Sequence, residues 1–317
     1  MAFNRIAVYG HRGWASSAIV TALIATGAPV KVLYRPGSDV SALPDSVAKV
    51  AVNLESDGEN ETLIAALQDI DIVISLVGHG GVTLQHALVK AIPRTKVKLF
   101  VPSDLAARYD EQGLRVPVNR AKLEVENAAR AAGIPVTVVL PGNFAEFALN
   151  TPAMGVDRRN NRVLFIGNSE HEALNLCTRP YVAAAYASLF ASTSLDQLCN
   201  RSIALSELRA TGAEIAQCLT EQHGGSPTRT GYESLESINQ VVEEALATGS
   251  PFALAFYCRK IWASGEQCGM VRHDAWDVRG YKKATLRGLL AQGELGEYRQ
   301  LPPAVLGFFE DGVERYT

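Results

Sequence analysis

A glycine turn near the N-terminus has the residue types of a phosphate-binding site. The apolar run 6–9 predicts a short buried strand, and the turn Gly10-His-Arg-Gly13 follows it directly. The small-residue stretch 14–26 that comes next predicts a helix. A glycine turn between a strand and a helix lets the backbone approach an anion, which the positive end of the helix then faces. The pattern therefore predicts a dinucleotide phosphate site that includes Trp14 at the start of the helix.

Two arginines near this turn indicate which dinucleotide to expect. Arg35 ends the second apolar strand, where an acid would favour a ribose with two free hydroxyls and an arginine suits a 2′-phosphate. Arg12 lies inside the turn, either as a second cation for that phosphate or as a solvated loop residue. These residues predict NADP(H). Because the third small position is Ser16 rather than glycine, an ordinary strand–helix turn is the alternative.

Lys122 is the residue best suited to proton transfer. It stands near the start of a predicted helix over 117–132, close to the carboxyl end of the fifth strand. The position four residues earlier is Val118, so the tyrosine–lysine pair of short-chain reductases is absent. Lys122 then acts as general acid or base, with a pKa lowered by partial burial, or it holds the cofactor ribose. The alternative is a solvated helix lysine.

The elements that must position these residues alternate in type over residues 1–150. Strands are predicted at 5–9, 30–34, 48–52, 71–77, 97–101 and 135–140, and helices at 14–26, 60–68, 82–92, 104–109 and 117–132. This order predicts an α/β fold, a doubly wound parallel Rossmann sheet over 1–150. A smaller, α-rich substrate lobe is expected over 151–317. It should contain a hairpin or loop at 157–161, a helix at 178–191 packed back on the sheet, and helices at 207–223 and 233–247.

Ligands of open α/β sheets bind beyond the carboxyl ends of the strands, so residues that follow other strands are also candidates. Val77 and Gly78 end strand four and are expected at the cofactor. His79 contacts the substrate or the nicotinamide ribose, or it is an ordinary loop histidine bonded to backbone. Asn53 follows strand three and is expected near the adenine.

Further candidates for substrate contact lie later in the chain. Ser103 and Asp104 follow strand five, although Asp104 also suits the N-cap of the predicted helix at 104–109. Asn143 either binds the ligand or braces its loop. Four aromatic residues at helical spacing line a hydrophobic pocket or belong to the core: Phe252, Phe256, Tyr257 and Trp262.

Several segments together carry a family resemblance. The stretch Leu99-Phe-Val-Pro-Ser-Asp104, the Lys122-x-x-Val-x-x-Ala-x-x-Ala helix, the run 132–139 and Gly142-Asn-Phe144 are similar to the isoflavone reductase-like branch of the NmrA-like atypical short-chain reductases. The resemblance implies that Gly10, Arg12, Gly13 and Arg35 bind NADPH phosphates and that Lys122 is the catalytic lysine. It also implies that Pro141, Asn143 and Phe144 border the nicotinamide and the substrate.

This sequence departs from the family pattern at three places. Ser16 replaces a glycine, Leu99 replaces the arginine of the strand-five motif, and Asp104-Leu-Ala replaces Glu-Phe-Gly. The last departure changes the loop that closes on the substrate, so the family's substrate class does not carry over.

Composition excludes several other classes of protein. A net charge of −3 gives no basic surface for nucleic acid, and no apolar run approaches the ~18 residues of a membrane span. The five cysteines form no Cys-x-x-Cys pair and the histidines are scattered, which argues against disulfides and zinc and favours the cytoplasm. The predicted partner is a small-molecule substrate. A homodimer is expected only because related proteins often form one.

The leading hypothesis is an NADPH-dependent reductase of a small, largely apolar or aromatic carbonyl, imine or enone, in secondary metabolism. Lys122 would be its general acid or base. Two alternatives stay open: an NADP(H)-binding redox sensor that does no chemistry, and an NADP(H)-dependent isomerase or rearrangement enzyme.

Overall fold

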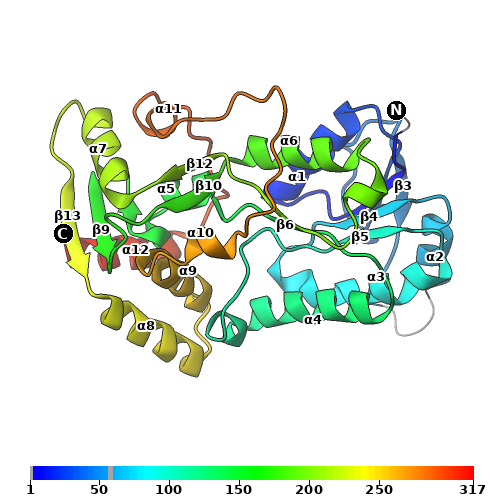
Figure 1. The fold of residues 1–317 in the computed structure, drawn as a ribbon, viewed down its shortest axis with the longest axis horizontal. Helices are drawn as coiled ribbons and strands as arrows, with labels where there is room; N and C mark the ends of the chain where they lie inside the picture. The colour runs from blue at the N-terminus through cyan, green and yellow to red at the C-terminus, as the bar shows by residue number, and fades with distance from the viewer. Residues whose placement is uncertain (1–2, 56–59) are drawn as a thin grey trace. The chain divides into compact units, whose positions relative to one another are not determined.

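The computed structural model describes residues 3–55 and 60–317 (Figure 1). Contacts group the chain into two compact units, neither of which is one continuous stretch. The first comprises Met1–Leu105, Pro117–Val139 and Val182–Ile203, and the second Ala106–Val116, Leu140–Tyr181 and Ala204–Thr317. Most of α6 (Arg179–Phe190) therefore belongs to the first unit, where the Asn4 side chain donates to the carbonyls of Phe190 and Thr193.

A parallel sheet forms the centre of the first unit. Its strands are β1 (Ile6–Tyr9), β2 (Val30–Tyr34), β3 (Ala48–Ala51), β4 (Ile72–Ser75) and β5 (Leu99–Val101), in the order β3-β2-β1-β4-β5. Val136 adds a parallel bridge beside Phe100, so the predicted sixth strand continues the sheet. Strands β1, β4 and β5 are buried along their whole length, as apolar parallel strands covered on both faces must be.

Helices cover both faces of this sheet (Figure 1). Helices α1 (Trp14–Ala25) and α6 lie on one face, and α3 (Gln85–Ala91) and α4 (Pro117–Ala131) on the other, where α2 (Glu61–Leu67) packs against α3. The doubly wound Rossmann arrangement is thereby confirmed. Short 3₁₀ turns occupy η1 (His79–Leu84), η2 (Ile92–Arg94), η3 (Gly113–Arg115), η4 (Pro152–Met154) and η5 (Leu195–Gln197).

Two predicted helices of the first 150 residues differ from the structure. The helix expected at 104–109 is absent, because the chain stays irregular between β5 and η3 and the Asp104 carboxylate pairs with a lysine instead of capping a helix. The helix expected at 82–92 begins earlier, as the 3₁₀ turn η1 that starts at His79. The glycine-rich residues 78–81 after β4 therefore begin a helical segment.

The second unit contains two three-stranded sheets besides its helices. One joins β12 (Leu208–Ala210), β10 (Leu174–Cys177) and β7 (Asn143–Phe144), and the other β13 (Arg229–Glu233), β9 (Arg162–Ile166) and β8 (Val156–Asp157). Strands β8 and β9 are antiparallel, which confirms the hairpin predicted at 157–161. A separate two-stranded sheet pairs β6 (Val138–Leu140) with β11 (Ser202–Ala204), and most residues of both strands belong to the first unit.

The helices of the second unit are α5 (Ala145–Asn150), α7 (Gly212–Gln222), α8 (Leu235–Thr248), α9 (Ala253–Ala263), α10 (Gln267–Met270), α11 (Leu286–Leu290) and α12 (Pro303–Glu314). The helix predicted at 207–223 was wrong at its start: residues 208–210 form β12. Helix α7 begins only after Thr211, whose side chain forms a reciprocal capping box with Glu214.

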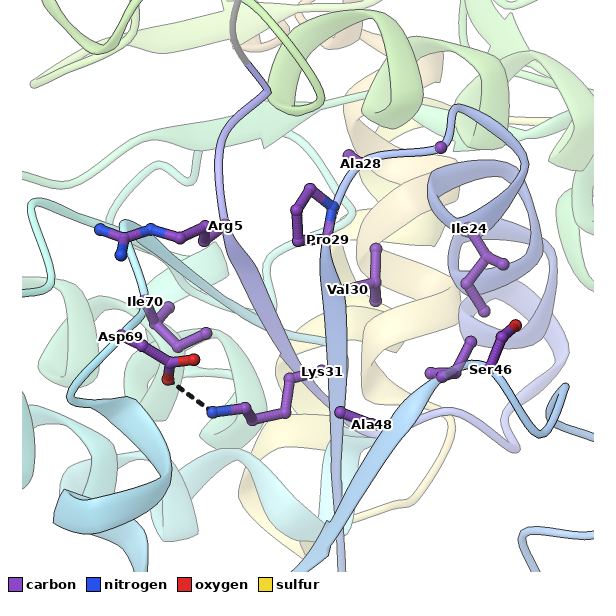
Figure 2. A pocket seen from close by; sticks show the side chains of 12 residues that line it. Arg5, Ile24, Ala28, Pro29, Val30, Lys31, Ser46, Ala48, Asp69 and Ile70 are labelled. Carbon is purple, nitrogen blue, oxygen red and sulfur yellow. Dashed lines mark hydrogen bonds and ion pairs between the residues drawn. The ribbon is translucent and has the colours of Figure 1, made fainter.

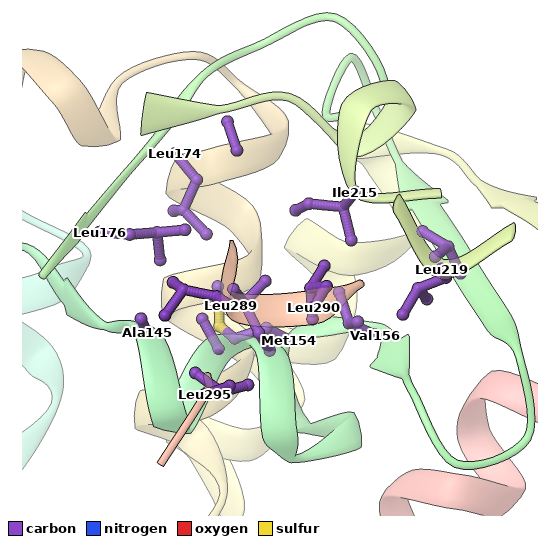
Figure 3. Close-up of a cluster of buried hydrophobic side chains, with 14 of the residues drawn as sticks. Ala145, Met154, Val156, Leu174, Leu176, Ile215, Leu219, Leu289, Leu290 and Leu295 are labelled. Carbon is purple, nitrogen blue, oxygen red and sulfur yellow. The ribbon is translucent and has the colours of Figure 1, made fainter. Parts of the chain in front are cut away.

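Aliphatic side chains fill the core of this unit. Leucines of β10, α7 and α11 meet Ala145, Met154 and Val156 in one buried cluster (Figure 3). Trp262 belongs to the same cluster, and the Phe252 and Phe256 rings pack against Phe309 at centroid distances of 5.1 and 6.1 Å. The core interpretation is therefore confirmed for Trp262, which is 1% exposed. Phe252 and Phe256 are half-buried, and whether they line a pocket stays a prediction. Among the described residues, no helix is both long and apolar enough to cross a membrane.

Candidate functional site

Gly10 and Gly13 shape the turn at the carboxyl end of β1. Gly10 has a φ of +95°, and a Cβ there would lie 2.9 Å from the carbonyl oxygen of Leu76 at the end of β4. Both the dihedral angle and this close approach therefore require glycine. Gly13 is the N-cap of α1, and a Cβ there would lie 2.9 Å from Ser16 Oγ. The buried Ser16 occupies the third small position of the motif. Its hydroxyl donates to the Gly13 carbonyl at 3.2 Å and so stabilises the turn.

The start of α1 suits a phosphate group. Gly13 offers no side chain to cap the helix, and the first turn carries no acidic residue that would compete for the positive end. Gly78 and Gly80, after β4, have open space where a Cβ would stand, and neither has a positive φ. Their protein surroundings thus give no reason for glycine, whereas a ligand that approaches the backbone closely does. The residues present fit a dinucleotide.

Ser103 connects the ends of β4 and β5. Its hydroxyl donates to the Val77 carbonyl at 2.7 Å, and its backbone N–H donates to Oε1 of the fully buried Gln85 at 2.8 Å. Gln85 in turn donates to the Val82 carbonyl at 3.0 Å. Ser103 therefore fixes the backbone of Val77, and its contact with substrate stays a prediction. His79, at the start of η1, is exposed.

Lys122 is buried rather than solvated. It lies in the second turn of α4, and its Nζ is 3.2 Å from Asp104 Oδ1, with side chains 8% and 6% exposed. Asp104 is therefore an ion-pair partner and not the helix cap that its sequence position suggested. Taking two charges out of water is costly unless they pair, so each group holds the other in place. The Asp104 carboxylate fixes the ammonium at the carboxyl end of β5.

The two arginines predicted to bind phosphate differ from Lys122 in burial. Arg12 and Arg35 are both exposed, the first in the glycine turn and the second directly after β2. His11, in the same glycine turn, is a residue that the sequence pattern does not single out. It is 9% exposed, and its Nε2 is 3.0 Å from the Asp39 carbonyl oxygen. A histidine inside a glycine turn matches no binding motif. Its role is therefore visible only from its hydrogen bond to Asp39 in the structure.

Asn53, expected near the adenine, follows β3. It is exposed, its side-chain oxygen accepts from the Glu55 N–H at 3.0 Å, and its carbonyl accepts from Asn60 at 2.6 Å. These bonds join Asn53 to Glu55 and to Asn60. The place of Asn53 near the adenine stays a prediction.

The candidates in the second unit form a buried polar network. Asn143 accepts a hydrogen bond from Gln267 Nε2 at 3.0 Å, and Asn175 donates to the Pro141 carbonyl at 3.0 Å. Gly142, with a φ of +72°, sits where a Cβ would lie 2.7 Å from Gln267. Asn143 thus braces its loop, and its contact with a ligand stays a prediction. Phe144 is the N-cap residue of α5 and is partly exposed.

Tyr257 also has a structural role in the second unit. It is 1% exposed, and its hydroxyl donates to Asp110 Oδ1 at 2.9 Å, while Lys260 donates to the other oxygen at 3.0 Å. Burial raises the pKa of the Tyr257 hydroxyl, so it stays protonated at neutral pH. Its predicted contact with substrate stays a prediction.

A pocket of about 480 Å³ lies at the opposite edge of the first-unit sheet, where β2 and β3 begin (Figure 2). Its Lys31 and Asp69 side chains pair at 2.6 Å. Ligands of such sheets bind beyond the carboxyl ends, so this pocket is separate from the glycine turn and Lys122. Among the described residues, no three His, Cys, Asp or Glu side chains gather as a metal site.

The fold and the glycine turn at the carboxyl edge of its sheet define a Rossmann-type α/β protein. A sequence model of the NmrA-like family matches residues 3–162, half of the chain. The protein belongs to this family.

Curated relatives match only part of their length. Phenylcoumaran benzylic ether reductase Pyrc5 of Pyrus communis is 30% identical over 187 residues, 54% of this chain and 59% of the relative. An isoflavone reductase homolog of Zea mays is 32% identical over 156 residues, 46% and 50% of the two chains. The chain thus spans between half and three fifths of these relatives.

Solved structures share the fold over almost the whole chain. A leucoanthocyanidin reductase–NADPH complex from Vitis vinifera has a TM-score of 0.69 at 19% identity and covers 98% of this chain and 99% of its own. An isoflavone reductase has a TM-score of 0.73 at 20% identity, with coverages of 92% and 99%. At these identities the likeness concerns the fold.

Proposed function

We propose that the protein is an NADPH-dependent reductase of a small apolar or aromatic carbonyl, imine or enone. The observation that carries the proposal is the carboxyl edge of the first-unit sheet. There the Gly10 turn approaches the end of β4, Arg35 follows β2, and Lys122 is fixed beside β5. The names of the matched relatives, reductases of phenylcoumaran benzylic ethers and an isoflavone reductase homolog, support an aromatic substrate from secondary metabolism.

The proposed division of labour follows from the positions of these groups. NADPH, when bound, supplies a hydride. The start of α1 with Gly10, Gly13 and Trp14 would bind the diphosphate, and Arg12 and Arg35 the 2′-phosphate. Lys122 would deliver the proton to the substrate. The Asp104 carboxylate would hold the Lys122 side chain in place between transfers. In the second unit, Pro141 and Phe144 are proposed to border the substrate.

Binding and turnover measurements test the two halves of this proposal separately. We expect the protein to bind NADPH more tightly than NADH, and Arg35→Ala to remove most of that preference. Equal affinity for the two nucleotides in the parent protein would refute the cofactor assignment. Catalysis is then tested by measuring the loss of NADPH absorbance in the presence of each member of a panel of aromatic enones, imines and ketones.

Lys122→Met tests the proton donor. We expect turnover to fall about 100-fold or more, in the range of lost general acid–base catalysis, while NADPH still binds. Parent-like turnover in this variant contradicts the role of Lys122. NADPH binding without turnover of any compound in the panel would favour the redox-sensor alternative.

A further inference from the structure

His11 connects the two segments that carry the arginines. Its ring lies in the glycine turn, yet only 9% of the residue is exposed. The Nε2 atom is 3.0 Å from the Asp39 carbonyl oxygen, and since a carbonyl only accepts, Nε2 carries the hydrogen. The ring also meets Tyr34 edge-on, with centroids 6.4 Å apart. One buried side chain of the turn thus holds the loop that follows β2.

That loop is rigid at its start. Gly37 has a φ of +80° after Pro36, and the Ser38 N–H donates to the Arg35 carbonyl at 3.0 Å, which is typical of a type II turn. Beyond the turn, the Asp39 carboxylate accepts from the Ser41 N–H at 2.9 Å. Arg35 therefore stands at one end of a short ordered segment, and the other end is bonded to His11.

Charges in this region show that the two segments face each other. The backbone hydrogen bond from Ser41 lowers the pKa of Asp39, and the positive charge of Arg12 lowers it further. Arg12 therefore lies within electrostatic reach of the loop. In β1, burial raises the pKa of Tyr9, and the positive charge of Arg35 opposes this rise. Each guanidinium thus acts on the strand or loop that carries the other.

We infer that His11 is a positioning residue that determines specificity for the 2′-phosphate. By bonding the Asp39 loop to the glycine turn, it sets the spacing of Arg12 and Arg35, between which the phosphate binds. The inference rests on the proposed NADP(H) function. NADH has no 2′-phosphate, so its affinity depends on the glycine turn and not on that spacing.

Two substitutions separate the hydrogen bond from the ring. His11→Phe keeps a ring against Tyr34 but removes the donor, and His11→Gln keeps an N–H that reaches the carbonyl. We expect the Kd for NADPH to rise about five- to tenfold in His11→Phe, the effect of one lost hydrogen bond, and the Kd for NADH to stay unchanged. His11→Gln should bind both nucleotides like the parent. Isothermal titration calorimetry at one pH and salt concentration measures all six constants.

A double variant tests whether His11 acts through Arg35. If it does, His11→Phe costs little further NADPH affinity in an Arg35→Ala background. Equal weakening of NADPH and NADH would mean that His11 merely supports the turn, and unchanged NADPH affinity would mean that it does not matter; either result overturns the inference. A parent protein without preference for NADPH would instead refute the proposed function, before any variant is made.

Discussion

At the scale of single residues, burial changes the meaning of two candidates. Lys122 and Asp104 were considered separately in the sequence, as a helix lysine and a helix cap, and the structure pairs them at 3.2 Å. Both are almost fully buried, so neither charge is well hydrated. Removing one partner leaves the other charge uncompensated, which costs more than the pair itself contributes.

This asymmetry predicts the stabilities of three variants. We expect Lys122→Met to lower the free energy of unfolding by about 3–5 kcal/mol, because the buried Asp104 carboxylate loses its ion-pair partner. Asp104→Leu should have a similar cost. The double variant Lys122→Met/Asp104→Leu should be more stable than either single one, as urea unfolding would measure. Additive losses would mean that the pair is not coupled.

At the scale of elements, two loops contain glycine for different physical reasons. Gly10 is required by its own φ and by the approach of β4, so its substitution strains the fold itself. Gly78 has an ordinary φ of −75° and open space where a Cβ would stand. The protein around Gly78 therefore does not require glycine, and we predict that a bound nucleotide does.

Alanine at these two glycines should therefore give opposite patterns. We expect Gly10→Ala to lower the free energy of unfolding by about 1–3 kcal/mol and to weaken both NADPH and NADH. Gly78→Ala should leave the melting temperature unchanged and weaken nucleotide binding alone. Thermal unfolding without nucleotide, followed by titration of each nucleotide, makes the comparison. Parent-like binding by a stably folded Gly78→Ala would show that no ligand passes there.

At the scale of the whole molecule, one buried acid links stability to pH. Glu146 is 2% exposed, and both its oxygens accept the Arg179 backbone N–H, at 2.8 and 3.1 Å. Burial raises its pKa from 4.5 to about 7, and the charge of Glu207 adds to this effect. The folded state therefore holds this proton at a pH where the unfolded chain has released it.

Stability should accordingly fall as the pH rises through this window. The folded state binds more protons than the unfolded one, so the contribution of Glu146 is complete below about pH 4.5 and lost by about pH 7, an effect of up to about 3 kcal/mol. We expect Glu146→Gln to flatten the decline, whereas the exposed Glu111→Gln should keep it. Urea unfolding at pH 5, 6, 7 and 8 would show this. A parent-like slope in Glu146→Gln assigns the decline to another group.

Local patterns were enough to predict the architecture of the first unit. Strands buried on both faces must be apolar throughout, and a glycine turn must separate β1 from α1. The order of elements and the positions of Gly10, Arg35 and Lys122 on them could therefore be predicted from the sequence. The helix at 104–109 was wrong because a local capping signal at Asp104 cannot register a partner 18 residues away on another element.

The Rossmann sheet, the glycine turn and the residue types at its carboxyl edge follow from the amino-acid order alone, since they depend on periodicity and on backbone angles of neighbouring residues. What each polar side chain does follows from the packing of distant segments. That packing paired Lys122 with Asp104, committed the Ser103 hydroxyl to Val77, and placed His11 against the Asp39 loop. Such contacts join segments that are distant in the chain, and a buried polar group takes whichever partner the packing brings within reach.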